Sequence, residues 1–241
     1  MMDDRKIPTI IERPFPNAVT YDLSTTGHVK ITLPESSTWS SGLHWHETHD
    51  EYLKVIKGTI RVQLGSTIQY ISATENEQPE IKVARYMWHE WQRAVPDGEV
   101  IVIERTEPDD NEKAIFFWNL NGVILDAPRL LNDRSSLISR LPRKAQGLAL
   151  DFWITLNLFV IFNYLDNIPV FLNAPKFAKR SNRTIISWLR GLDWLVSHAI
   201  LLLASWGGWA LGIRPVNRQF TPADVCSKWW SNKKERRNKV A

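Results

Sequence analysis

The sequence of 241 residues has a single cysteine, Cys226, and lacks the short motifs that mark several common chemistries. One cysteine excludes an intramolecular disulfide and suits a reducing, intracellular compartment. The sequence contains no glycine-rich phosphate loop, no G-x-S-x-G nucleophile elbow and no dinucleotide fingerprint. These absences argue against phosphate-binding loops, serine hydrolysis and nicotinamide chemistry.

An apolar leader segment is also lacking. The first sixteen residues, MMDDRKIPTIIERPFP, carry charges and prolines where a secretory signal needs an apolar run. We therefore expect no signal peptide and an intracellular location.

Positive charge is scarce in the first part of the chain and abundant in the second. Residues 1–146 contain 17 Lys and Arg against 21 Asp and Glu, a net charge of −4. Residues 147–241 contain 13 against 5, a net charge of +8. The two parts are therefore expected to do different jobs. The basic tail, with its Lys and Arg run over 233–237, carries no recognised nucleic-acid motif, so no nucleic acid is expected as a partner.

The first part has the pattern of a mainly β protein. Residues 1–36 contain four prolines and predict an irregular arm that covers a sheet edge, with one strand over 28–33. Further short apolar segments, separated by turn residues, predict a sandwich or barrel. We expect these strands over 51–56, 59–64, 67–71, 80–83, 89–93, 99–104 and 114–118.

The pattern changes after residue 119. A short helix and a basic connector are predicted over 129–144, followed by two long apolar stretches over 148–165 and 185–213. A polar, basic link joins them over 173–183. The predicted organisation is an arm and β-barrel over 1–125, a connector over 126–147, and an apolar helical pair with a basic tail over 148–241.

A cluster of metal-ligand residue types lies near the start of the predicted strands. His44 and His46 project to the same face of a strand, and Glu51 can return to that face as the next strand begins. His89, on a later strand, is the candidate fourth ligand. Three imidazoles and one carboxylate leave a divalent ion with open coordination positions, as catalytic sites do. His49 and Glu47 are alternative ligands, although a solvated loop position fits both better.

The spacing of these residues resembles the cupin family. His44-x-His46-x4-Glu51-x6-Gly58 matches the second half of the first cupin motif, while the second motif is matched only at His89. Ala84, Tyr86 and Arg93 stand where that motif has proline, glycine and asparagine, and Thr38 replaces the leading glycine of the first. The resemblance covers roughly residues 35–125. It implies a cupin-type β-barrel (jelly roll) that holds a metal through His44, His46, Glu51 and His89.

Strand alternation predicts the neighbours of this site. If the ligands face inward, Leu53, Val55, Met87 and Trp91 line the cavity, while Trp45 and Trp88 face out. Such a lining favours an apolar or aromatic organic substrate. Arg93, like Arg61 and Arg85, could instead anchor an anionic group.

The sequence thus predicts a metal-dependent cupin enzyme that acts on a small, largely apolar or aromatic metabolite. We slightly favour an oxygenase with Fe(II), in secondary-metabolite biosynthesis by analogy with similar cupins. Mn, Ni or Zn would instead serve a metal-dependent isomerase, cyclase or decarboxylase. A non-catalytic ligand-binding cupin, anchored to a membrane or a partner, is the alternative from another class.

The C-terminal apolar stretches suggest a membrane. Residues 194–213 contain no charge, and as a helix they are long enough to span a bilayer of about 30 Å. Residues 148–165 carry Asp151, Asn157 and Asn163 and predict a poor independent span. Helices that span the membrane, helices that lie on an anionic membrane, and an appendage packed on the barrel or on a second subunit of a homodimer remain open.

Overall fold

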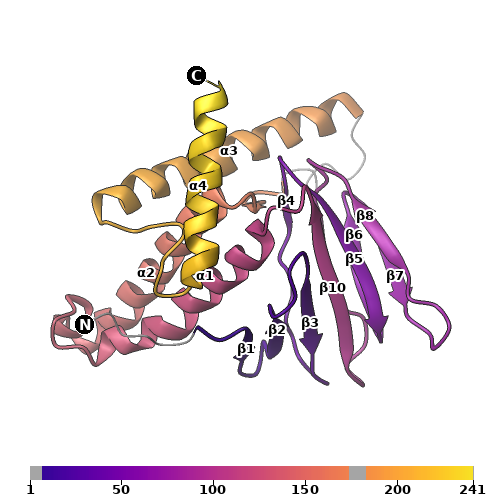
Figure 1. Ribbon diagram of the computed structural model, residues 1–241, viewed down its shortest axis with the longest axis horizontal. Helices are drawn as coiled ribbons and strands as arrows, with labels where there is room; N and C mark the ends of the chain where they lie inside the picture. Colours follow the sequence, from indigo (N-terminus) through magenta and orange to yellow (C-terminus); the bar gives the residue numbers. More distant parts are fainter. Residues whose placement is uncertain (1–6, 174–182, 241) are drawn as a thin grey trace.

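A computed structural model describes residues 7–173 and 183–240, with no side chains described at 183–184 and 233–240. A β part comes first and a helical part follows, and in Figure 1 the helices gather beside the strands. The predicted basic link falls almost entirely outside the described residues, as do the side chains of the basic run over 233–237. The mainly β fold class with a C-terminal helical region is confirmed.

Two antiparallel sheets form the β part. The first has the strand order β1-β2-β3-β10-β5-β8, and the second has the order β11-β4-β9-β6-β7. The N-terminal arm supplies β1 and β2, which continue the first sheet beyond β3 and so cover that edge as expected. The strands are β1 Ile10–Arg13, β2 Val19–Asp22, β3 Val29–Leu33, β4 His44–Trp45, β5 Asp50–Lys57, β6 Thr59–Leu64, β7 Thr67–Ser72, β8 Glu80–Val83, β9 His89–Arg93, β10 Val100–Glu107 and β11 Ile168–Pro169.

The core of this β part is built by alternation along each strand. On β10, Val100 and Val102 are buried while Ile101 between them is partly exposed. On β6, Ile60 and Val62 are fully buried and belong to the same apolar cluster. Because side chains alternate between the faces of a strand, one face of each sheet contributes to a shared core. Burial of each such side chain stabilises the fold by about 1.5–3 kcal/mol.

The turn between β5 and β6 requires glycine. Gly58 has a φ of 78°, which places it in the left-handed region. A Cβ atom added there would lie 2.7 Å from the carbonyl oxygen of Glu99. Both the backbone angle and the neighbouring chain therefore exclude a larger residue at this turn.

The strand predicted over 114–118 is wrong, because this segment lies in the helix α1 (Glu112–Asp126). The apolar run Ile115 to Trp118 is buried at four consecutive positions, so alternation could not distinguish strand from helix. Two asparagines of α1 are also fully buried. The Nδ2 atom of Asn119 donates to Ile115 and Thr221, and its Oδ1 atom accepts from Asn217. These bonds tie α1 to the chain before the last helix.

The two long apolar stretches form helices, as predicted. They are α2 (Arg143–Tyr164) and α3 (Arg183–Ala210), preceded by two short 3₁₀ helices at Ala127–Leu131 and Ile138–Arg140. The two long helices pack so closely that a Cβ atom at Gly208 would lie 2.5 Å from Val160. The tail forms α4 (Ala223–Val240), and Cys226 and Trp229 of this helix are buried in the main core.

Candidate metal centre

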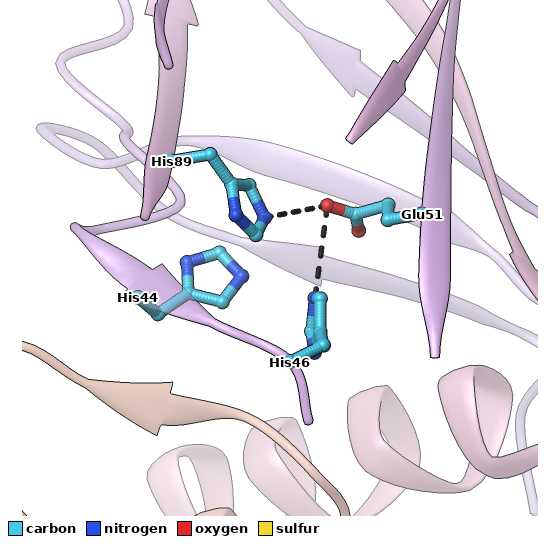
Figure 2. A group of neighbouring side chains, drawn as sticks. All are labelled: His44, His46, Glu51 and His89. Carbon is cyan, nitrogen blue, oxygen red and sulfur yellow. Dashed lines mark ion pairs between the residues drawn. The ribbon is translucent and has the colours of Figure 1, made fainter. Parts of the chain in front are cut away.

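The four predicted ligands meet between the two sheets. His44 lies in β4, His46 directly follows it and His89 lies in β9, all on the five-stranded sheet, while Glu51 comes from β5 of the other sheet. His44 and His89 are paired across neighbouring strands. One ligand atom of each residue lies within 4.8 Å of the others, and all four residues are buried. Figure 2 shows the side chains converging on one point.

Backbone carbonyls fix the orientation of all three imidazole rings. Nδ1 of His44 is 2.8 Å from the oxygen of Gly42, and Nδ1 of His89 is 2.9 Å from that of Met87. Nδ1 of His46 bonds the backbone oxygen of Asp166. Because a carbonyl only accepts, each Nδ1 carries the proton and each Nε2 keeps a free lone pair. This is how proteins orient histidines that bind metals.

The atoms facing the centre have no hydrogen-bond partner among the described residues. They are Nε2 of His46, Nε2 of His89 and Oε2 of Glu51, and all three are buried. Nε2 of His89 and Oε2 of Glu51 are 2.7 Å apart, but they are not aligned for a hydrogen bond. Buried polar atoms without partners are costly, and a cation at their meeting point would satisfy all of them. The residues therefore fit a divalent transition metal.

The carboxylate of Glu51 is held by a buried lysine that the sequence did not indicate. Lys113, in the first turn of α1, bonds Oε1 of Glu51 and lies 3.0 Å from Oε2 of Glu104 on β10. Oε1 of Glu104 in turn accepts a 2.6 Å bond from the indole nitrogen of Trp91. Lys113 thus occupies one oxygen of Glu51 and leaves the other directed at the histidines.

Burial and charge set the protonation of these groups. Burial lowers the pKa of His44 well below its usual value, and it also lowers the pKa of His46, so both rings are neutral. Burial is the largest single effect and would raise the pKa of Glu51, but the Lys113 ammonium and the neighbouring histidines together outweigh it and hold that pKa well below its usual value. Burial and the charge of Glu51 raise the pKa of Glu104. Neutral imidazoles and an ionised carboxylate are the forms that bind metal.

The turn after α2 covers the site. Asp166 bonds His46 through its backbone oxygen, and its carboxylate accepts bonds from the backbone nitrogens of Glu47 and Thr48. The carboxylate also lies 2.8 Å from Nδ1 of His49. Although burial opposes the shift, the bond from His49 helps lower the pKa of Asp166 to about 2. One residue from the helical part therefore fixes the whole loop that carries His46.

The two alternative ligands serve this covering structure. His49 lies between Asp110 and Asp166, which raise its pKa to about 9 against the opposing effect of burial. Its acidic neighbours Asp110 and Glu112 are within reach for a second metal, but Glu112 already accepts a bond from Trp229. Glu47 accepts bonds from the indole nitrogens of Trp45 and Trp194. Both residues thus make contacts outside the four-ligand cluster.

The residues predicted to line a substrate cavity are mostly core residues. Leu53, Val55 and Trp91 are fully buried in the main apolar cluster. Met87 precedes β9 instead of belonging to it, so strand alternation does not turn it inward, and its side chain is partly exposed. The guanidinium of Arg93 donates to the carbonyl oxygens of Pro34, Val95 and Gly98. Contact of these residues with a substrate stays a prediction.

Trp45 and Trp88, predicted to face out, are covered by the helical part. They form a separate apolar cluster with Ile168 of β11 and Leu201 of α3. The cavity that adjoins the site has a volume of only about 20 Å³. It is lined by His46, His49, Thr106, Glu112, Lys113, Phe116, Leu165, Asp166 and Asn167.

Sequence reasoning missed Glu104, Lys113 and Asp166. Glu104 follows Val100 and Val102 at alternate positions on a predicted strand, so its place on the inward face was a usable signal. Lys113 stood beside a segment assigned to the wrong secondary structure. Asp166 lies 120 residues from His46, and local patterns carry no information over that separation.

Comparison with known proteins gives distant structural likenesses only. No family model and no curated protein matches the chain. Among solved structures, the chain is similar to the capsular polysaccharide assembling protein CapF from Staphylococcus aureus, with 14% identity, a TM-score of 0.33 and coverage of 45% of this chain and 35% of that one. A predicted oxalate decarboxylase from Thermotoga maritima gives 14% identity, a TM-score of 0.34 and coverage of 42% and 96%. The CENP-C cupin domain from Drosophila melanogaster gives 12% identity, a TM-score of 0.32 and coverage of 41% and 75%.

The chain therefore spans about a third of the length of CapF. At these identities and TM-scores the likenesses carry no argument about activity. The cupin family remains a resemblance carried by the spacing of His44, His46, Glu51 and Gly58.

Proposed function

We propose that this protein is a metal-dependent enzyme of the cupin type that acts on a small molecule. The observation that supports this most is the convergence of three buried atoms, on His46, His89 and Glu51, that have no hydrogen-bond partner among the described residues. When bound, Fe(II) would supply redox chemistry with dioxygen, whereas Mn, Ni or Zn would supply Lewis acidity. Burial keeps His44 and His46 neutral, and Lys113 helps to keep Glu51 ionised.

The small volume beside the site limits what can reach it. About 20 Å³ holds roughly one water molecule, and of the four candidate ligands only His46 lines this cavity. A metabolite would need the turn Leu165 to Asn167 to move, because these residues form one wall of the cavity. We retain an oxygenase acting on a small, apolar or aromatic metabolite as the favoured activity. An isomerase, cyclase or decarboxylase would use the same ligands.

A non-catalytic role is the second candidate, and the same small cavity favours it. A closed site with four protein ligands can hold a metal for stability alone. In that case the ion would strengthen the contact between the two sheets, because Glu51 comes from one and the histidines from the other.

Metal content of purified, reconstituted protein tests the ligand assignment. We expect about one equivalent of metal in the wild type and less than a tenth in His46→Ala, with the barrel still folded by circular dichroism. His28→Ala, outside the cluster, is the matched control and should keep its metal. Equal metal in His46→Ala and wild type would disprove the assignment.

Nitric oxide distinguishes the two candidates when the protein is loaded with Fe(II). An open coordination position gives the paramagnetic signal of a nitrosyl complex, whereas a closed structural site gives none. A signal in the wild type supports the enzyme, and its absence in protein with full metal content would favour the non-catalytic role.

A further inference from the structure

The outward face of α3 is apolar along most of the helix. Trp188 is 77% exposed and Trp209 is 84% exposed, near opposite ends. Between them lie further exposed apolar side chains, and residues 194–213 contain no Lys, Arg, Asp or Glu. A surface helix normally turns its polar side to water, so this face requires a non-aqueous partner. The exposed side chains are Trp188, Leu192, Leu195, Leu202, Leu203, Trp206 and Trp209, which we call the α3 outer face.

The opposite face of α3 is the more polar one. Asp193 and Ser197 are fully buried, and Ser197 donates a 2.8 Å bond to the carbonyl oxygen of Pro169. The helix therefore packs its polar residues against the protein and presents its large apolar residues outward. Packing within one chain does not explain such an arrangement, whereas a lipid surface does.

The helix is attached to the β part, which decides how it meets a membrane. By length and composition alone, Arg143–Tyr164 and Ile185–Ala210 could each cross a bilayer, and only 17% of the most apolar window in each is buried. In the described structure, however, Leu201 is buried against Trp45 and Trp88, and Trp194 donates to Glu47. A spanning α3 would have to break these contacts. A helix lying in the plane of the membrane surface keeps all of them, and Figure 1 shows α3 crossing one end of the molecule.

Charge and aromatic content favour lipid over a second copy of the chain. Residues 147–241 carry a net charge of +8, and the exposed Arg214 directly follows the apolar segment of α3, whereas Arg190 lies over the Trp88 ring. Symmetric pairing would bring two such basic parts together, whereas an anionic bilayer would complement them. Tryptophan is enriched where membranes meet water, and the α3 outer face carries it toward both ends.

We propose that the α3 outer face docks the protein on an anionic lipid bilayer, with the helix in the plane of the surface. The apolar side chains enter the boundary between headgroups and acyl chains, and the basic C-terminal part, including Arg214, contacts anionic headgroups. The site between the sheets then lies at the membrane, one helix away from the lipid.

Vesicle binding of the full-length protein tests this. Wild type should sediment with vesicles of phosphatidylcholine and phosphatidylglycerol, bind phosphatidylcholine alone more weakly, and show a blue shift of tryptophan emission. Leu203→Glu with Trp206→Glu should weaken binding by about tenfold or more. The matched control is Ile68→Glu with Tyr70→Glu, an exposed apolar pair on β7, which should bind as wild type does. Trp188→Glu, at the other end of the face, gives an independent second variant.

Four results would overturn the proposal. The first is no binding of wild type to anionic vesicles, and the second is equal loss in the β7 control. The third is a stable dimer in light scattering that Leu203→Glu with Trp206→Glu dissociates, which would assign the face to a second copy. Alkaline carbonate should release bound protein from vesicles, and retention would instead indicate a spanning helix. Unchanged circular dichroism of each variant verifies folding.

Discussion

At the scale of single residues, the site is defined by a chain of charges that extends beyond the ligands. Glu51, Lys113 and Glu104 form a buried row in which one cation lies between two carboxylates. The carboxylates outweigh the effect of burial and raise the pKa of Lys113, so this lysine stays charged and acts as a fixed cation. A bound metal would add a second positive charge on the other side of Glu51.

The loss of stability on replacing this lysine should therefore depend on whether metal is bound. Lys113→Met leaves two buried carboxylates without a cation and should cost about 3–5 kcal/mol in the metal-free protein. The loss should be smaller with metal bound, because the ion then balances Glu51. Urea unfolding with chelator and with excess metal measures both values. Lys144→Met, on an exposed position of α2, is the control, and an equally small change in both variants would contradict the charge role.

Asp166 positions a ligand without contacting the centre. Its backbone has a φ of 49°, which asparagine also tolerates, so Asp166→Asn removes charge with little change of shape. The asparagine amide has only one oxygen, so it can no longer accept the hydrogen bonds from Glu47, Thr48 and His49 together. We expect metal affinity to fall by roughly 10–100-fold, measured by competition with a chelator. Asp151→Asn, at an exposed position of α2, should leave the metal affinity unchanged. An unchanged affinity in Asp166→Asn would show that Asp166 does not position a ligand.

At the scale of elements, the close crossing of α2 and α3 depends on a glycine, which has no side chain. Gly208 leaves room for Val160, and a Cβ atom there would approach it to 2.5 Å. The sequence predicted that the apolar stretches form helices, but it did not show which residue packs against each glycine.

Two glycine substitutions on α3 should therefore change the free energy of unfolding in opposite directions. Gly208→Ala should destabilise the protein by about 1–3 kcal/mol, because it overpacks the crossing. Gly191→Ala, with nothing within 4 Å, should stabilise it by up to about 1 kcal/mol through helix propensity. Chemical unfolding of both variants decides this, and stabilisation by Gly208→Ala would show that the helices are not in close contact.

At the scale of the whole molecule, the helical part completes the β part. β11 pairs with β4, Asp166 bonds His46, and Ile161 of α2 and Trp229 of α4 are buried in the main core. One of the three interpretations left open by the sequence was a helical appendage packed on the barrel. The contacts across the two parts instead make the metal site depend on both.

Truncation tests this dependence directly. A protein ending at residue 146 loses the cover of the site and should bind metal much more weakly and unfold with lower cooperativity. Thermal unfolding and metal analysis of the fragment measure the effect, with intact protein as control. A folded fragment with a full equivalent of metal would show that the helical part contributes nothing to the site.

The sequence alone determined the features that rest on local periodicity. Alternating residues identified most strands, including β6, β8 and β9 with their bounds, and the spacing of His44, His46 and Glu51 identified three members of the buried cluster that could hold a metal. His89 followed from its place on a later strand. These predictions succeeded because alternation on a strand depends only on neighbours in the chain.

Tertiary structure alone decided what surrounds those ligands. Burial on several sides made residues 112–126 a helix, although their apolar run fits a strand equally well. The approach of α1 brought Lys113 to Glu51, and the turn after α2 brought Asp166 to His46. Docking on the β part also determined which face of α3 points outward. Each of these outcomes depends on contacts between distant segments, and such contacts leave no periodic trace in a single sequence.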